Sequence, residues 1–179
     1  MNAHIHRHSE GRRLYWPLCL LLLQLSCQTH QHLVLEPVGP ASSDSAPGQL
    51  DFIGTGYLRV YSATETRQVG KFLNYYPHTD YVIYSTNGAQ FKFVRNSTAY
   101  VDESPALIRL PAGRYTIRAQ DDDYGRVTVP VVIQNGQTTT VWLETRDAPS
   151  TERPDPGNSV RLPDGRVVGW RAKTAGLSP

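Results

Sequence analysis

The stretch that decides the fold reads Leu110-Pro111-Ala112-Gly113-Arg114-Tyr115-Thr116-Ile117-Arg118-Ala119. Pro111 restricts its own φ and Gly113 can adopt a positive φ, so the first four residues favour a tight turn. After the turn, apolar and polar side chains alternate, which places Tyr115, Ile117 and Ala119 on one side of a pleated strand. The stretch therefore predicts a turn followed by a strand with one buried and one solvated face.

Short strands are expected on both sides of this stretch. They cover residues 57–62, 69–76, 81–85, 90–94 and 106–110 before it, and 126–134 and 138–144 after it. Asn87-Gly88 predicts a hairpin turn in which both central residues take positive φ, and Asn135-Gly136 predicts another turn. No segment shows a helical period. We therefore expect an all-β fold, an immunoglobulin-like or prealbumin-like antiparallel β-sandwich over residues 51–146.

A longer pattern links residues 105–144 to a known family. It consists of Leu110-Pro111-Ala112-Gly113-x-Tyr115-x-Ile117-x-Ala119, a further strand, and then Asn135-Gly136-Gln137-Thr138-Thr139-Thr140-Val141. This pattern resembles the closing strands of carboxypeptidase regulatory-like domains, which form a transthyretin-like sandwich family, and of the similar PEGA repeats. The resemblance implies a sandwich that accompanies a catalytic domain and is not itself catalytic. The tyrosine-rich segment before Pro105 is longer than the family pattern, so its strand order stays open.

Charge and cysteine content exclude several classes of function. The chain has 179 residues and a net charge of +2, and the basic excess lies entirely within residues 1–26. The remainder is neutral, which argues against a nucleic-acid partner. Cys19 and Cys27 both lie near the start, so the body can form neither a disulfide framework nor a thiolate zinc site.

Residues 1–26 resemble a bacterial lipoprotein signal peptide. Arg12 and Arg13 precede a leucine-rich run that is too short for the roughly 20 apolar residues of a spanning helix. The resemblance implies that Cys27 is acylated after cleavage and anchors the protein by lipid. Three residues before the cysteine, where such signals usually have leucine, this chain has Gln24. Ordinary signal-peptide cleavage that releases a soluble protein therefore stays an alternative. Gln28 favours the outer membrane, with the protein facing the periplasm or the cell surface.

The segments flanking the sandwich are expected to lie outside its core. Residues 27–50 are polar and interrupted by prolines, which predicts a flexible tether. Residues 147–179 read as a proline-rich linker followed by a hairpin at 160–170 around Pro163-Asp164-Gly165. Because a lone hairpin is marginally stable, it should dock either on its own domain or on a partner.

Three sequence patterns resemble a calcium site, a hydrolytic site and a glycosylation site, but each lacks something that the site requires. Asp121-Asp122-Asp123 offers oxygen ligands for Ca²⁺ but lacks the spacing of a calcium loop, so a solvated turn is expected. His78 and Asp80 lie near serines, yet no Gly-x-Ser-x-Gly elbow is present. Asn96-Ser97-Thr98 matches a glycosylation acceptor, but in a bacterial protein it is expected to be a plain polar loop. We expect no enzymatic activity, no metal and no cofactor.

The candidate ligand-binding residues are aromatic. Tyr75, Tyr76, Tyr81 and Tyr84 precede Phe91 and Phe93, and such side chains suit recognition of carbohydrate or protein surfaces. Packing in the core is the alternative. The function expected is a non-catalytic, lipid-anchored binding or scaffold module of the envelope. The alternatives are a carbohydrate-binding module that uses the tyrosine-rich face and an assembly subunit that adds the C-terminal hairpin to a partner sheet.

Overall fold

The computed structural model describes residues 32–41, 53–97, 99–146 and 156–173. The regular structure of these residues is β-strand apart from one short 3-10 turn, η1 (Pro156–Asn158), so the predicted all-β class is confirmed. No helix in the described part of the chain is long and apolar enough to span a membrane.

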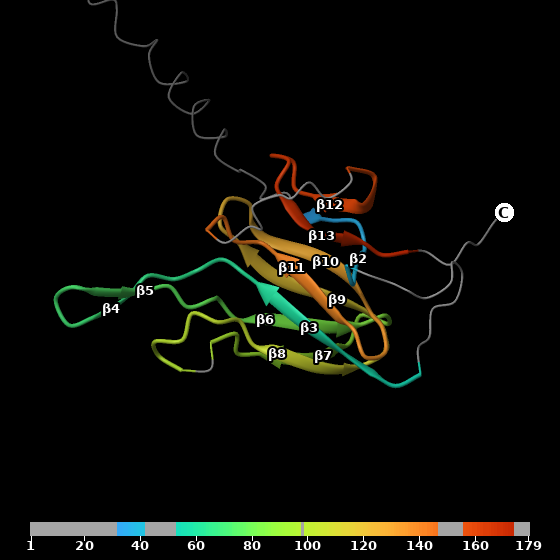
Figure 1. Cartoon of the computed structure of the whole chain (residues 1–179), viewed down its shortest axis with the longest axis horizontal. Helices are drawn as coiled ribbons and strands as arrows, with labels where there is room; N and C mark the ends of the chain where they lie inside the picture. The colour runs from blue at the N-terminus through green and yellow to red at the C-terminus, as the bar shows by residue number, and fades with distance from the viewer. Residues whose placement is uncertain (1–31, 42–52, 98, 147–155, 174–179) are drawn as a thin grey trace, which may run out of the picture. The chain divides into compact units, whose positions relative to one another are not determined.

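The larger sheet has the strand order β12-β13-β2-β10-β9-β6-β7 (Figure 1). In addition, β1 pairs with β10. Its strands are β1 (Leu33–Val34), β2 (Val38–Gly39), β6 (Tyr81–Ser85), β7 (Gln90–Val94), β9 (Gly113–Asp121), β10 (Gly125–Ile133), β12 (Ser159–Arg161) and β13 (Val167–Arg171). Both β1 and β2 run parallel to β10. The other pairings in this sheet are antiparallel, as predicted, so the sheet is mixed and parallel only where β1 and β2 join β10.

A three-stranded sheet forms the second layer. Its order is β11 (Thr138–Trp142), β3 (Thr55–Tyr61) and β8 (Leu107–Pro111), with β11 parallel to β3. Outside both layers, β4 (Arg67–Val69) and β5 (Leu73–Tyr75) form a two-stranded ribbon that turns at Gly70, whose φ is 66°. The single strand predicted over residues 69–76 is therefore wrong, because this glycine reverses the chain.

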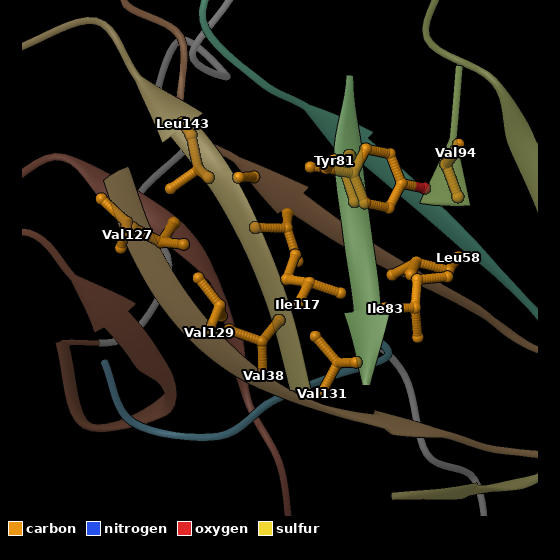
Figure 2. Packing of buried hydrophobic residues seen from close by; sticks show 14 of the residues in the cluster. Val38, Leu58, Tyr81, Ile83, Val94, Ile117, Val127, Val129, Val131 and Leu143 are labelled. Carbon is orange, nitrogen blue, oxygen red and sulfur yellow. The ribbon is translucent and has the colours of Figure 1, made fainter. Parts of the chain in front are cut away.

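The hydrophobic core lies between the two layers. Leu58 from β3, Ile83 from β6 and Ile117 from β9 are fully buried, and Figure 2 shows them gathered with Val38 and other apolar side chains. The predicted inward face of β9 is confirmed at Ile117 and Ala119. Burying a side chain of this size contributes about 1.5–3 kcal/mol, so the core is the main source of stability.

The segment from Leu110 to Gly113 connects the two layers instead of forming a tight hairpin. Pro111 ends β8 in the small sheet and Gly113 begins β9 in the large one. Gly113 does not have a positive φ, so the predicted turn conformation is wrong. The Tyr115 hydroxyl donates a hydrogen bond to the Pro111 carbonyl over 3.1 Å, which stabilises this connection between the two sheets.

The hairpin between β6 and β7 is correctly predicted, but its turn differs. Gly88 has a φ of 81°, whereas no described non-glycine residue has a positive φ. Asn87 instead accepts hydrogen bonds from the Ser85 hydroxyl and the Ala89 amide. The pairing also shifts register between Ile83 and Tyr84, as a β-bulge does.

Two segments expected to lie outside the core belong to the large sheet. β1 and β2 fall within residues 27–50, so the predicted tether is wrong for residues 33–39, and Val38 is fully buried. β13 of the C-terminal hairpin pairs with β2, so the hairpin docks on its own domain. A Cβ on Gly169 would lie 2.5 Å from Cγ1 of Val38, so this close packing requires glycine. The predicted signal peptide, the predicted lipidation site Cys27 and residues 147–155 of the predicted linker lie outside the described residues.

Candidate binding face

The strands of the large sheet present a second face that points away from the core, here called the outer face. In β9 it carries Arg114, Thr116, Arg118 and Gln120, which alternate with buried Ile117 and Ala119. The strand pairing places Tyr84 of β6 and Pro130 of β10 beside Thr116. The remaining members are Val82, Phe93, Arg126, Thr128 and Val132.

One end of the outer face is hollowed into a depression of about 700 Å³, here called the first depression. Tyr84, Phe93, Arg118 and Arg126 line it from the strands. The guanidinium carbon of Arg118 lies 4.7 Å from the centre of the Tyr84 ring, within the range of a cation–π contact. The first depression therefore contains an ordered pair of one aromatic and one cationic side chain.

The charges around the first depression leave two of its arginines, Arg118 and Arg126, available. No carboxylate among the described residues forms an ion pair with Arg118 or Arg126. The acids at the rim already have partners: Glu65 pairs with Arg67, and Asp122 accepts hydrogen bonds from the backbone amides of Thr64 and Thr145. A guanidinium without an ion pair can bind a carboxylate or a similar anion through two parallel hydrogen bonds.

Of the four tyrosines predicted to bind ligand, Tyr84 lies in the first depression and Tyr81 does not reach the outer face. Tyr81 is 1% exposed and packs in the core, because successive residues of β6 point to opposite faces. Burial raises the pKa of Tyr81, and its hydroxyl has no hydrogen-bond partner among the described residues. Tyr81 borders the first depression but its side chain is buried, so the structure gives no support to its predicted ligand role.

The other two tyrosines lie in a different part of the molecule. Tyr75 ends β5, and Tyr76 follows it with the guanidinium carbon of Arg146 3.6 Å from its ring centre. The Tyr76 amide donates to a carboxylate oxygen of Glu103 over 2.8 Å. The predicted cluster of four tyrosines is thus not brought together. The partner of Tyr84 is Arg118, which the sequence did not single out, and Arg126 lines the same depression.

His78 is a buried structural residue, 4% exposed. Its Nδ1 lies 2.7 Å from the Ser62 carbonyl oxygen and 3.8 Å from a carboxylate oxygen of Glu144. The Tyr61 ring packs edge-on against the imidazole. Asp80, the other polar residue considered with His78, accepts a hydrogen bond from the Asn96 amide. Within the described ranges, no three His, Cys, Asp or Glu side chains form a group that could hold a metal ion.

The acidic turn between β9 and β10 holds the C-terminal hairpin. Asp121 is 1% exposed and accepts hydrogen bonds from the amides of Asp123 and Tyr124, so the expectation of a solvated turn is wrong for this residue. Arg166 contacts Asp121 at 3.2 Å, Asp123 at 2.8 Å and Asp164 at 2.6 Å. We call this group of four residues the Arg166 clamp.

Acid is expected to loosen the Arg166 clamp. The pKa of Asp164 lies below its ordinary value of 3.8, because slight burial, which raises it, is outweighed by the hydrogen bonds and charge of Arg166. A lowered carboxyl pKa stabilises the folded state above the ordinary value, and this stabilisation is lost as the pH falls through the lowered value. Asp164 is exposed, so solvent limits the effect to less than about 1 kcal/mol.

The indole resonance of half-buried Trp170, followed by NMR, reports on the docking of the hairpin. It should shift toward its solvent-exposed position as the pH drops below about 4. The Arg166→Met variant should show this shift already at neutral pH. An identical acid response in both proteins would contradict the clamp.

Comparison with known proteins adds no further identification. No protein-family model, curated protein or solved structure matches the chain. The resemblance to carboxypeptidase regulatory-like domains therefore stays a prediction, and the chemistry of the outer face is what points to a function.

Proposed function

We propose that this protein is a non-catalytic binding module of the cell envelope and that the first depression binds carbohydrate. Lipidation of Cys27 holds the module at the outer membrane, where it faces the periplasm or the cell surface. The observation that supports a ligand at this surface is the stacked pair of Tyr84 and Arg118 beside Arg126. Each of these three side chains projects from a paired strand, which fixes its position.

The composition of the first depression suits a sugar. Aromatic rings offer large apolar surfaces with little rotamer freedom to lose, and the half-exposed ring of Phe93 extends the surface of Tyr84 toward the sheet edge. The guanidinium groups and the side-chain amide of Gln120 can donate hydrogen bonds to hydroxyl or acidic groups. The lipid anchor keeps the module near envelope polymers, which raises their effective concentration.

The strand-addition alternative has less support. The hairpin that suggested it is paired with β2 within its own sheet. The edge strand β7 has a bulge in its pairing with β6 and an exposed lysine, Lys92, two features that disfavour the pairing of a further strand.

The Tyr84→Ala variant of the full chain tests the carbohydrate proposal. Truncating a central aromatic residue of an interface costs about 2 kcal/mol or more, so polysaccharide affinity should fall by roughly 30-fold. Affinity gel electrophoresis with neutral and acidic polysaccharides measures this change. Tyr57→Ala, on the opposite sheet, is the control and should bind as the unmodified protein does. Full retention of binding by Tyr84→Ala would refute the proposal.

Mass spectrometry of the mature protein tests the anchor. We expect the first residue to be Cys27 carrying a diacyl or triacyl group, and the Cys27→Ser variant to lose membrane association. An unacylated amino terminus at another residue would contradict the lipoprotein assignment and leave the binding surface unaffected.

A further inference from the structure

The outer face contains a second hollow at the other end of β9. This second depression, of about 300 Å³, is lined by Arg114, Pro130 and Val132 and by residues of β13 and its continuation. Arg171 at its edge is already paired with Glu36. Arg114, by contrast, has no ion pair among the described residues. Each depression thus contains at least one arginine that is free to bind an anion.

The two depressions lie along one strand. Arg114 and Arg118 project from the same face of β9, four positions apart, which corresponds to about 13 Å at the usual rise of a strand. Thr116 lies between them, flanked by Tyr84 and Pro130, so no acidic side chain interrupts the path. Arg126 continues the series, because it pairs with Gln120 beyond Arg118. The result is a row of cationic groups that follows β9 from Arg114 to Arg118 and continues to Arg126 on β10, with a neutral floor.

We infer that the outer face binds a linear, carboxylate-bearing polysaccharide that lies along β9 and occupies both depressions. This inference rests on the proposed function and adds the ligand's charge, shape and direction. A neutral polymer would cover Arg114 and Arg126 without giving them an anionic partner. A single acidic sugar cannot reach from Arg118 to Arg114. A repeating acid satisfies both requirements.

Nucleic acid fits this surface less well. Tyr84 is already stacked by Arg118, which leaves no series of open rings for successive bases. The arginine forks, in contrast, match the planar carboxylate of a uronic acid.

Binding of oligogalacturonates of increasing length to the full chain, measured by isothermal titration calorimetry, tests the inference. Affinity should rise in a step once the oligomer spans both depressions, and then level off. Arg114→Gln should abolish this step, lowering the affinity of long oligomers about tenfold or more and leaving short oligomers unchanged. Arg118→Gln should lower the affinity for oligomers of every length. Arg95→Gln, an exposed arginine outside both depressions, is the matched control and should bind normally.

The possible failures are distinguishable. Equal affinity for neutral glucan oligomers would overturn the acidic ligand while leaving the proposed carbohydrate function intact. Affinity independent of length, or an Arg114→Gln variant that binds normally, would overturn the extended path. Single-stranded DNA that binds more tightly than oligogalacturonate at equal salt would overturn the ligand class. If the Tyr84→Ala variant binds polysaccharide as tightly as the unmodified protein, the proposed function itself is refuted.

Discussion

The Gly56→Ala variant is expected to unfold the sandwich or to lower its free energy of unfolding by more than about 4 kcal/mol. An added Cβ would lie 2.1 Å from the Gln134 carbonyl oxygen and 2.9 Å from that of Gln137. Both contacts are with backbone at the turn between β10 and β11. This backbone cannot withdraw, because the Tyr57 amide donates to the Gln137 carbonyl and the Gly136 amide donates to the Thr55 carbonyl.

Chemical denaturation followed by circular dichroism measures the loss, and the soluble yield reports on a variant that fails to fold. Gly113→Ala is the matched control, because its added Cβ would have its nearest neighbour at 3.6 Å and its φ is not positive. The control should remain within about 1 kcal/mol of the unmodified protein. Equal unfolding midpoints for the two variants would show that β3 does not pass this close to the turn.

The Asn96→Ala variant is expected to lose about 2–4 kcal/mol of stability. Asn96 is fully buried, and its side-chain amide donates to the Val60 carbonyl and to the Ser62 hydroxyl. Its side-chain oxygen accepts a hydrogen bond from the Ala106 amide over 3.1 Å. Removing the side chain eliminates these three hydrogen bonds in the protein interior, through which one residue connects β3 to the segment between β7 and β8.

Thermal and denaturant unfolding of Asn96→Ala should be compared with Asn74→Ala, which changes an exposed residue of β5 and should alter stability by less than about 0.5 kcal/mol. Asn96→Asp keeps the shape but loses both donors, so it should be at least as destabilised as the alanine variant. An unchanged midpoint for Asn96→Ala would refute the structural role. The expectation of a plain polar loop at this acceptor pattern is wrong for Asn96, because its amide is an internal structural group.

Most strands could be predicted because their alternation is local. Val127, Val129 and Val131 of β10 recur at every second position, and all three are buried as expected. Gly136 takes a φ of 68° in the turn that Asn135-Gly136 predicts. These features depend on neighbours in the chain, which a single sequence displays.

Features that depend on distant partners could not be predicted. β1 and β2 are two residues long and lie among prolines, so they show no period, and their pairing depends on β10 and β13. Asp121 looks like an exposed turn residue, and the contact with Arg166 appears only when the hairpin docks. The candidate binding face could be predicted only in part. The sequence singled out Tyr84 but not Arg118, because an arginine on a solvated strand face has the same sequence pattern with or without a ligand.

The placement of β2 between β10 and β13 bears on when the fold can be completed. Trp170 of β13 pairs with Gly39 of β2. β2, near the beginning of the described chain, can therefore complete its pairing only when β13, near the end, is present. Contacts of such long sequence separation slow folding, because the intervening loop must close first. A chain that emerges from its N-terminus should consequently reach its native state only after residue 171 has emerged, and until then it would depend on protection from proteolysis and aggregation.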